Sequence, residues 1–171
     1  MGVEQYVDLR LASLLLGREI ERYREEHQGP IIGLASRAFS RLTLGSFMGV
    51  TTGFDARDQP ILMCRRADGH DVDVAGLSDG TRDQLYLALR LASIEYRLSR
   101  EESLPLIVDD VLVNFDDERA GAALELLGDL ACKTQVLFFT HHHRLLELAR
   151  NRVPADRLQE HDLGVLGTSV A

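Results

Sequence analysis

Two carboxylates stand directly after an apolar run in the middle of the chain. The run "LPLIV" occupies residues 104–108, and Asp109 and Asp110 follow it. A short apolar run predicts a buried strand, and parallel sheets bind ligands beyond the carboxyl ends of their strands. At that position one carboxylate can help to hold a divalent cation while the other orients water. The alternative is a solvated strand end, or two acids that prepare the following turn.

Three consecutive histidines follow a second apolar run, "QVLFFT". A zinc cluster of His141, His142 and His143 is one interpretation, but consecutive histidines point in different directions and rarely chelate one metal together. Exposed histidines at a helix start are a second interpretation. We favour a third, in which His141 ends the strand and reaches a phosphate while the other two begin a helix. Because both strands should end at one edge, His141 can then meet Asp109 and Asp110.

A turn containing serine and glycine, "GLSDGT" at residues 76–81, runs into an amphipathic helix. Such a turn offers a hydroxyl, free backbone N–H groups and the positive end of the helix dipole, a combination that suits phosphate oxygens. Taken alone the signal is weak, because Ser78 or Thr81 can be nothing more than a helix cap.

The elements that must position these residues follow from the hydrophobic pattern. A helix that ends near Gly45 precedes three strand-like runs separated by Gly, Asp and Pro turn signals, at 47–52, 60–65 and 71–75. From Leu77 onward, helices alternate with the two apolar runs. Buried strands alternating with helices indicate an α/β fold with a parallel sheet. The predicted helices are 81–98, 117–131 and 143–150, and the predicted strands are 104–108 and 135–140.

The first residues predict one long, highly charged helix over 3–27, which "QGP" at 28–30 should stop. An ordinary surface helix is one interpretation. The end of a coiled-coil arm whose partner strand is missing is the other, because the charged part is too polar to stand alone.

Composition limits the class of protein. A chain of 171 residues suits one domain, and its net charge of −8 argues against a surface made for nucleic acid as a whole. Cys64 and Cys132 lack metal-ligand spacing, which favours reduced thiols and a cytoplasmic protein. No apolar run approaches the roughly 18 residues of a membrane span, so we expect no membrane partner.

The order and spacing of the motifs along the chain are more informative than any one motif alone. In sequence, "LSDGT", "LPLIVDD", "NFDD" and "QVLFFTH" resemble the C-terminal half of an ABC-type ATPase head. The most similar branch comprises the structural-maintenance-of-chromosomes (SMC) ATPases and their DNA double-strand-break repair (SbcC-like) relatives. The resemblance is close from Leu77 to about Ala149 and looser elsewhere. It implies a P-loop NTPase head, with residues 1–28 as the end of a coiled-coil arm and residues 29–171 as the C-terminal ATPase lobe.

For two segments the resemblance implies contacts across a dimer of heads. Residues 77–81 match the signature motif, in which Ser78 and Gly80 would contact the γ-phosphate of an ATP held by another subunit. Asn114 to Asp116 match the D-loop, which crosses the same interface. Asp79 and Thr81 depart from the commoner signature, although "LSxGTRDQL" is similar to bacterial members of this branch.

For the strand ends the resemblance implies the chemistry of ATP hydrolysis. Asp109 matches the Walker B aspartate that supports Mg²⁺, and His141 matches the switch histidine that touches the γ-phosphate. Asp110 takes the place of the usual catalytic glutamate. Its side chain is one methylene shorter, a difference that can slow hydrolysis by misplacing the carboxylate.

The chain lacks a phosphate-binding loop. A match to G-x-x-x-x-G-K-[ST] would have to use Lys133, but Leu127 and Cys132 occupy the glycine positions and the lysine precedes a strand. By resemblance, an N-terminal Walker A lobe and a second head must complete the site for ATP and Mg²⁺. We expect the chain alone to be inactive, and DNA repair or chromosome maintenance, with DNA as a partner, is implied by family only.

Two alternatives remain at this stage. A metal-dependent phosphoesterase or nuclease would use Asp109, Asp110, Asp116 and the histidines directly, but it leaves the glycine-flanked turn unexplained. A non-catalytic dimerisation or DNA-docking module would have kept the fold and lost turnover.

Overall fold

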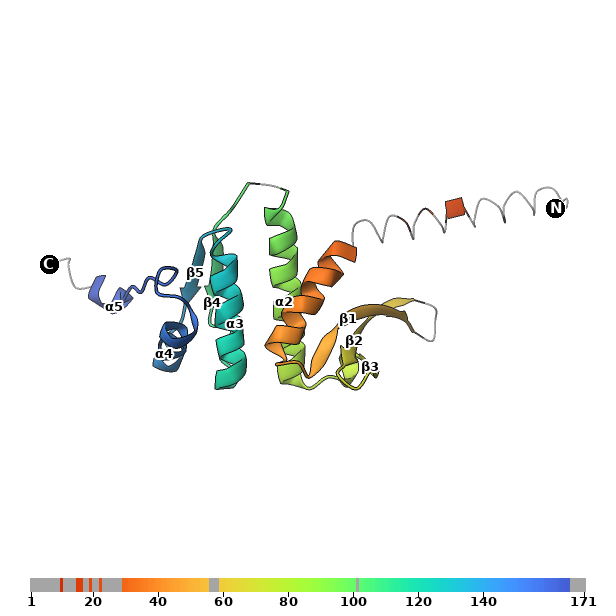
Figure 1. The fold of residues 1–171 in the computed structure, drawn as a ribbon, viewed down its shortest axis with the longest axis horizontal. Helices are drawn as coiled ribbons and strands as arrows, with labels where there is room; N and C mark the ends of the chain where they lie inside the picture. Colours follow the sequence, from red (N-terminus) through yellow and green to blue (C-terminus); the bar gives the residue numbers. More distant parts are fainter. Residues whose placement is uncertain are drawn as a thin grey trace.

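The computed structural model describes residues 29–55, 59–100 and 102–166, together with Arg10, Leu15, Leu16, Glu19 and Arg22. A helix over residues 29–42 leads into an antiparallel sheet, and an α/β half follows it (Figure 1). The predicted coiled-coil arm, residues 1–28, lies almost wholly outside the described residues. No helix in the described part of the chain is both long and apolar enough to cross a membrane.

The antiparallel sheet consists of β1 (Phe47–Phe54), β2 (Pro60–Arg66) and β3 (Asp71–Asp73), in that spatial order. It packs tightly against the helix over 29–42. The Ser36 hydroxyl donates to the Val50 carbonyl and accepts from the Val50 N–H, both at 2.9 Å. A Cβ at Gly49 would lie 2.7 Å from the Cβ of Ser36, so this close approach requires glycine.

The α/β half begins after the short 3₁₀ helix η1 (Val74–Gly76). β4 and β5 pair in parallel, with Leu106 opposite Val136 and Asp109 opposite Phe139. This pairing confirms the predicted parallel α/β arrangement, and the element bounds agree with the predicted ones to within about two residues. The elements are α2 (Asp79–Leu98), β4 (Leu106–Asp109), α3 (Asp117–Leu130), β5 (Val136–Phe139), α4 (His143–Arg152) and α5 (Leu163–Leu166).

Helix α2 joins the two halves of the molecule. It lies between the helix over 29–42 and α3 (Figure 1). Leu85 is fully buried in a core shared with Phe39 and Leu145, whereas Leu91 belongs to a second cluster with Val108 of β4. One helix thus packs on both sides, and burial of a leucine side chain stabilises the fold by about 1.5–3 kcal/mol.

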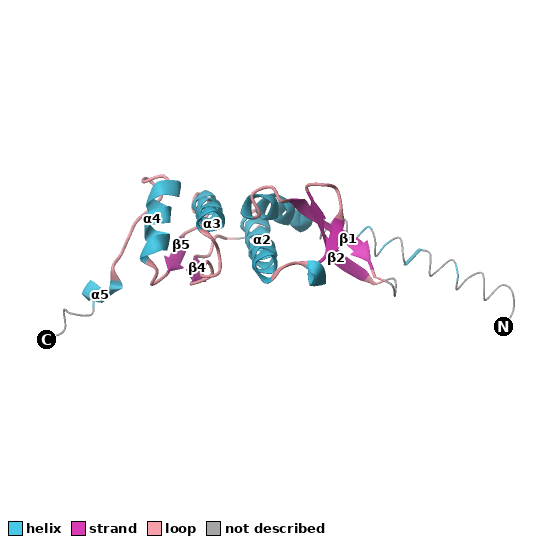
Figure 2. Cartoon of the chain, turned by 90° about the horizontal axis from the view of Figure 1, so that it is seen from below, coloured by secondary structure: helices cyan, strands magenta, loops and turns pink. Residues whose placement is uncertain are grey.

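The parallel sheet is covered on one face only. Val108 and Phe138 pack with α3 and α2, and α3 lies along one side of the two strands (Figure 2). On the other face Ile107 is 66% exposed and Phe139 is 40% exposed. The prediction of fully buried strands is therefore wrong for this face. The apolar run is nonetheless typical of a strand that is covered on both faces.

The predicted end of the first helix at 28–30 falls at the boundary of the described residues, because residues 23–28 lie outside them, and it stays a prediction. Gly29 and Pro30 are both helical. The ring of proline fixes φ at a helical value, so a helix can include proline where its missing N–H has no acceptor to satisfy.

The two cysteines should differ in reactivity. Burial, with a smaller contribution from the negative charge of Asp73, raises the pKa of the Cys64 thiol to about 11, whereas Cys132 is exposed. Because the thiolate is the reactive form, native protein at pH 8 should react with a disulfide probe through Cys132 alone, and both thiols should react in denaturant. Cys132→Ser should abolish the rapid native reaction, and rapid labelling of that variant would contradict the buried position of Cys64.

Candidate functional site at the carboxyl edge of the parallel sheet

The backbone turns sharply where β4 ends. Asp109 is the last residue of β4, and the next residue, Asp110, has a φ of +46°. Aspartate and asparagine are the non-glycine residues that adopt this left-handed conformation most readily. The Asp110 N–H donates to the Phe139 carbonyl at 3.1 Å. This bond continues the ladder of β4 and β5 by one rung, and the chain leaves the strand direction only after the Asp110 N–H.

His141 meets Asp110 at this edge. Its Nδ1 lies 2.8 Å from Oδ2 of Asp110. The imidazole is 73% exposed and the carboxylate is 34% exposed, so a ligand can reach both. The Asp109 side chain is exposed, and no hydrogen bond or ion pair joins it to another described residue. The three residues that the sequence placed at the strand ends therefore lie at one accessible edge.

The surroundings of Asp110 favour its charged form. Partial burial alone would raise the pKa of this carboxyl group, but polar contacts with the Thr140 hydroxyl and His141 outweigh that effect, and the charges of His141 and His142 add to it. The net result is a pKa below the ordinary value for aspartate. At neutral pH the group is therefore an anion, which can bind a cation or accept a hydrogen bond from water.

The side chains of His141 and His142 lie side by side, whereas the sequence analysis expected consecutive histidines to point in different directions. The rings of His141 and His142 are adjacent, with centroids 3.9 Å apart. His142 is the N-cap of α4, with φ −94° and ψ 106°, and His143 is the first helical residue. The chain turns from strand to helix at this point, which brings two consecutive side chains to the same side.

The turn at residues 77–81 is held from both sides. Ser78 is the N-cap of α2, and its hydroxyl accepts from the Thr81 N–H and lies 2.8 Å from the Thr81 hydroxyl. Leu77 is buried in the core. Arg82 donates to the Leu77 carbonyl at 3.2 Å and pairs with Asp79. The capping interpretation of Ser78 is therefore correct, and the exposed side of the turn remains available to a ligand.

Gly80 faces open space. A Cβ built at this position would meet no heavy atom within 4 Å, so nothing within the described chain requires glycine here. An atom that approached the backbone from outside would benefit from the missing side chain.

The segment after Asp110 joins β4 to α3. Asn114 is exposed, and Phe115 is buried in the core. Asp116 caps α3 by accepting from the Arg119 N–H at 2.9 Å, a hydrogen bond that, with the charge of Arg119, lowers the pKa of Asp116. Arg144 of α4 holds the segment in place by donating to the Phe115 carbonyl at 2.7 Å.

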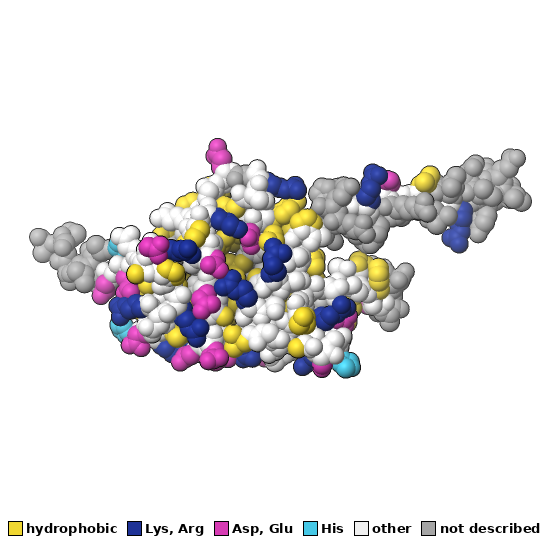
Figure 3. Space-filling view, viewed as in Figure 1, with side chains coloured by type: hydrophobic (Ala, Val, Ile, Leu, Met, Phe, Trp, Pro, Cys, Tyr) yellow, Lys and Arg dark blue, Asp and Glu magenta, His cyan; other side chains and the backbone are white. Residues whose placement is uncertain are grey.

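The turn and the strand ends lie at the same end of the molecule. Helix α2 begins at that end, and the loop that joins α2 to β4 lies at the other, so β4 runs back toward the start of α2 (Figure 1). On the face seen in Figure 3, acidic and basic side chains are interspersed. This face offers no continuous basic surface.

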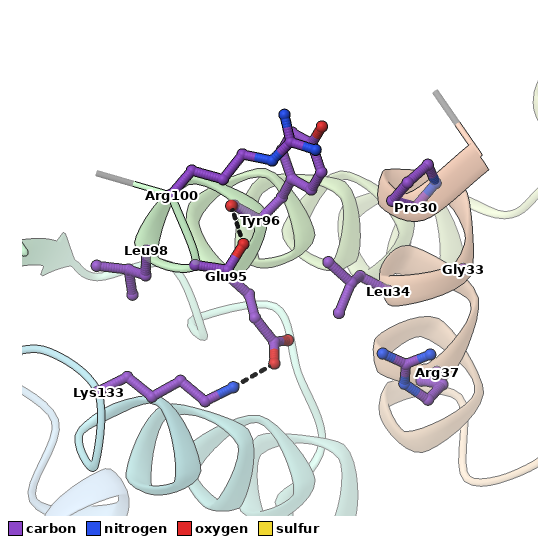
Figure 4. A pocket seen from close by; sticks show the side chains of 10 residues that line it. Pro30, Gly33, Leu34, Arg37, Glu95, Tyr96, Leu98, Arg100 and Lys133 are labelled. Carbon is purple, nitrogen blue, oxygen red and sulfur yellow. Dashed lines mark hydrogen bonds and ion pairs between the residues drawn. The ribbon is translucent and has the colours of Figure 1, made fainter. Parts of the chain in front are cut away.

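A hollow of about 640 Å³ lies near the opposite end of α2, beside the helix over 29–42 (Figure 4). Lys133, which the sequence excluded as a phosphate-loop lysine, pairs there with Glu95. Arg100 lies over the ring of Tyr96, 4.4 Å from its centroid. The lysine therefore takes part in a contact between α2 and the turn before β5, away from the strand ends.

Sequence comparison finds a relative of unknown role. No protein-family model matches the sequence. The chain is 31% identical over 143 residues to the uncharacterized protein YhaN of Bacillus subtilis (strain 168), and the match covers 83% of this chain. The chain spans 14% of the length of that curated relative.

Structural comparison identifies the fold. An SMC ATPase studied for ATP-driven dimerization and DNA-stimulated activation superposes with a TM-score of 0.61 at 13% identity, over 75% of this chain and 77% of its own. The Smc head of Pyrococcus furiosus, with an extended coiled coil and bound to the C-terminal domain of ScpA, gives 0.57 at 14% identity, over 85% and 37%. The chain has the fold of an SMC head domain. The predicted fold class, an α/β arrangement with a parallel sheet flanked by helices as in such a head, is thereby confirmed.

Within the SMC head fold, three further residues support the site. The sequence analysis named only His142 among them, as one ligand of a histidine zinc cluster. Thr140 and His142 lie beside Asp110, and Arg144 holds the segment before α3. The position of Thr140, at the end of an apolar run, was the one available signal. The others depend on the turn into α4, which spacing along the chain does not reveal.

Gly80→Ala should leave the fold intact. Alanine is favoured over glycine in a helix by about 0.5–1 kcal/mol, and there is room for the methyl group. The free energy of unfolding in urea should therefore stay equal or rise slightly. Gly49→Ala provides the contrast, because its Cβ would collide with Ser36, and we expect a loss of about 1–3 kcal/mol. A comparable loss for Gly80→Ala would mean that the site is not open.

Proposed function

We propose that the chain is the C-terminal lobe of an ABC-type ATPase head, which hydrolyses ATP only together with a Walker A lobe and a second head. One observation carries the proposal. Within an SMC-head fold, Asp109, Asp110 and His141 lie at the carboxyl edge of the parallel sheet. Nδ1 of His141 lies 2.8 Å from Oδ2 of Asp110. This is the edge at which α/β proteins bind their ligands.

The residues at the edge suit Mg²⁺ and a triphosphate. Asp109 offers exposed carboxylate oxygens, the ligand type that Mg²⁺ prefers. In the head, Asp109 would support the ion, whose charge would neutralise the phosphates. Asp110, an anion at neutral pH, would position the attacking water and accept its proton. His141 would interact with the γ-phosphate and hold Asp110 in place.

The turn at residues 77–81 suits a phosphate on another subunit. Its exposed Ser78 hydroxyl, the open space at Gly80 and the N-terminus of α2 form one surface. We propose that Ser78 and Gly80 contact the γ-phosphate of ATP bound to the second head, and that Asn114 and Asp116 lie at the same interface.

The uncovered face of the parallel sheet supports the proposal that a further lobe packs against it. Ile107, Leu137 and Phe139 form an exposed apolar strip on β4 and β5, whereas parallel sheets are normally covered on both faces. The phosphate-binding loop is also missing from this sequence. An N-terminal lobe that carries G-x-x-x-x-G-K-[ST] would supply both.

The larger assembly follows from the same proposal. Residues 1–28 would be the end of a coiled-coil arm and residues 29–171 the ATPase lobe of a homodimeric, cytoplasmic machine. ATP-driven dimerization and DNA-stimulated activation are known for the SMC ATPase with which the chain superposes. They support dimerisation and DNA as a partner here, in chromosome maintenance or DNA repair.

The phosphoesterase alternative gains little from the structure. Asp116 is occupied as the cap of α3 and is not part of the group that Asp110 forms with the histidines. The phosphoesterase alternative uses three aspartates and the histidines together, so it would require Asp116 to lie in that group.

Asp110→Asn should abolish turnover and preserve binding. Asparagine tolerates the left-handed backbone but cannot accept the proton, so ATP hydrolysis by the reassembled head should fall about 100-fold or more. The head is reassembled with the Walker A lobe encoded upstream of the Met1 codon or by a neighbouring gene. ATP binding is measured in parallel. Asp156→Asn, at an exposed carboxylate away from the edge, is the matched control. Unchanged turnover in Asp110→Asn with normal binding would exclude the proposed role.

Ile107→Asp should separate the two lobes. Burial of an isoleucine side chain is worth about 1.5–3 kcal/mol, so a charge at this position should weaken lobe association at least tenfold. Met48→Asp, at an equally exposed residue of β1, should have no effect. Equal affinities of the two variants, measured by calorimetry, would show that the lobe does not cover this face.

A further inference from the structure

Three side chains at the sheet edge converge on one point. Asp110, His141 and His142 each offer a ligand atom, and these atoms all lie within 4.8 Å of one another. We propose that this group is a binding site for a zinc-class divalent cation, separate from the Mg²⁺ that ATP would bring. Its occupation would regulate the ATPase, a consequence that rests on the proposed function.

Two polar atoms of the group have no hydrogen-bond partner. Oδ1 of Asp110 and Nε2 of His142 are both buried from solvent, and no described residue bonds to either. Buried polar atoms in folded proteins are nearly always paired, and an exception calls for an explanation such as a bound ion. Oδ2 of the same carboxylate already contacts His141, so the two unpaired atoms, one of Asp110 and one of His142, belong to the same group.

The donor set selects the metal. Two imidazoles and one carboxylate are ligands for Zn²⁺ and similar transition metals, whereas Mg²⁺ prefers oxygen ligands and retains its waters. Three protein ligands leave one tetrahedral position open, as in catalytic rather than structural zinc sites. Asp109, which offers oxygen atoms only, is not part of the group.

The backbone holds the ligands in place before any ion arrives. The left-handed turn and the bond to the Phe139 carbonyl fix Asp110. The Thr140 hydroxyl accepts from the His142 N–H at 3.2 Å, and the two histidine rings are already adjacent. Contacts of this kind around a metal site orient its ligands and raise its affinity.

Binding of the cation would make the proposed catalytic side chains unavailable for ATP hydrolysis. Zn²⁺ on Asp110 and His141 would take the lone pairs that are needed for water activation and for contact with the γ-phosphate. His142 has no part in the proposed hydrolysis, so it separates the metal site from the ATPase site.

The first experiment uses the full chain without nucleotide. Co²⁺ should give the visible absorption of a tetrahedral nitrogen- and oxygen-ligated ion, and Zn²⁺ should displace it. His142→Ala should weaken binding of both ions at least tenfold, and Asp110→Asn, which keeps the backbone conformation, should do the same. His143→Ala and Cys132→Ser are matched controls and should bind as the unchanged chain does. Circular dichroism verifies that each variant is folded.

Equal Co²⁺ affinity in His142→Ala and the unchanged chain would overturn the site, as would an octahedral spectrum. The second experiment adds Zn²⁺ to the reassembled head with Mg²⁺ and ATP. Turnover of the unchanged head should fall at Zn²⁺ concentrations at which His142→Ala keeps whatever turnover it shows without Zn²⁺. Binding without this inhibition would overturn the regulatory role alone. Absence of turnover in the reassembled head under every condition would instead count against the proposed function, while the Co²⁺ result on the isolated chain would still decide the site.

Discussion

The turn at Asp110 is the constraint on which the rest of the edge depends. The N–H of Asp110 completes the ladder with the Phe139 carbonyl, its left-handed φ turns the chain out of β4, and its carboxylate contacts His141. An extended residue there would continue along β4 instead of turning toward α3. Asp110 therefore contacts both the end of β5 and His141, and its position determines how the polar side chains at this edge are arranged.

The serine–glycine turn at the start of α2 combines a helix cap with an open backbone. The Ser78 hydroxyl caps the helix and Arg82 fixes the turn to the core, yet the backbone at Gly80 remains open. Stability requires the cap but not the glycine. The surplus of space is what distinguishes this turn from an ordinary helix start.

Sequence patterns predicted the elements well because each has a local cause. The apolar runs before Asp109 and before His141 and the turn signals between the short strands depend on nearest neighbours. The exposed face at Ile107 and Phe139 could not be predicted in this way, because the run indicates a strand covered on both faces. The adjacent rings of His141 and His142 depend on the dihedral angles of one capping residue, which the residue types do not specify.

Helix α2 extends from the turn at residues 77–81 to the region beside the helix over 29–42. Its 20 residues extend over roughly 30 Å at 1.5 Å per residue, and its side chains are embedded in both cores. An α-helix of this length behaves as a stiff rod, so a tilt imposed where it begins must appear as a displacement where it finishes. That far end borders the helix over 29–42, toward which the preceding residues lead. Helix α2 therefore joins the end of the molecule that carries the strand ends to the helix over 29–42.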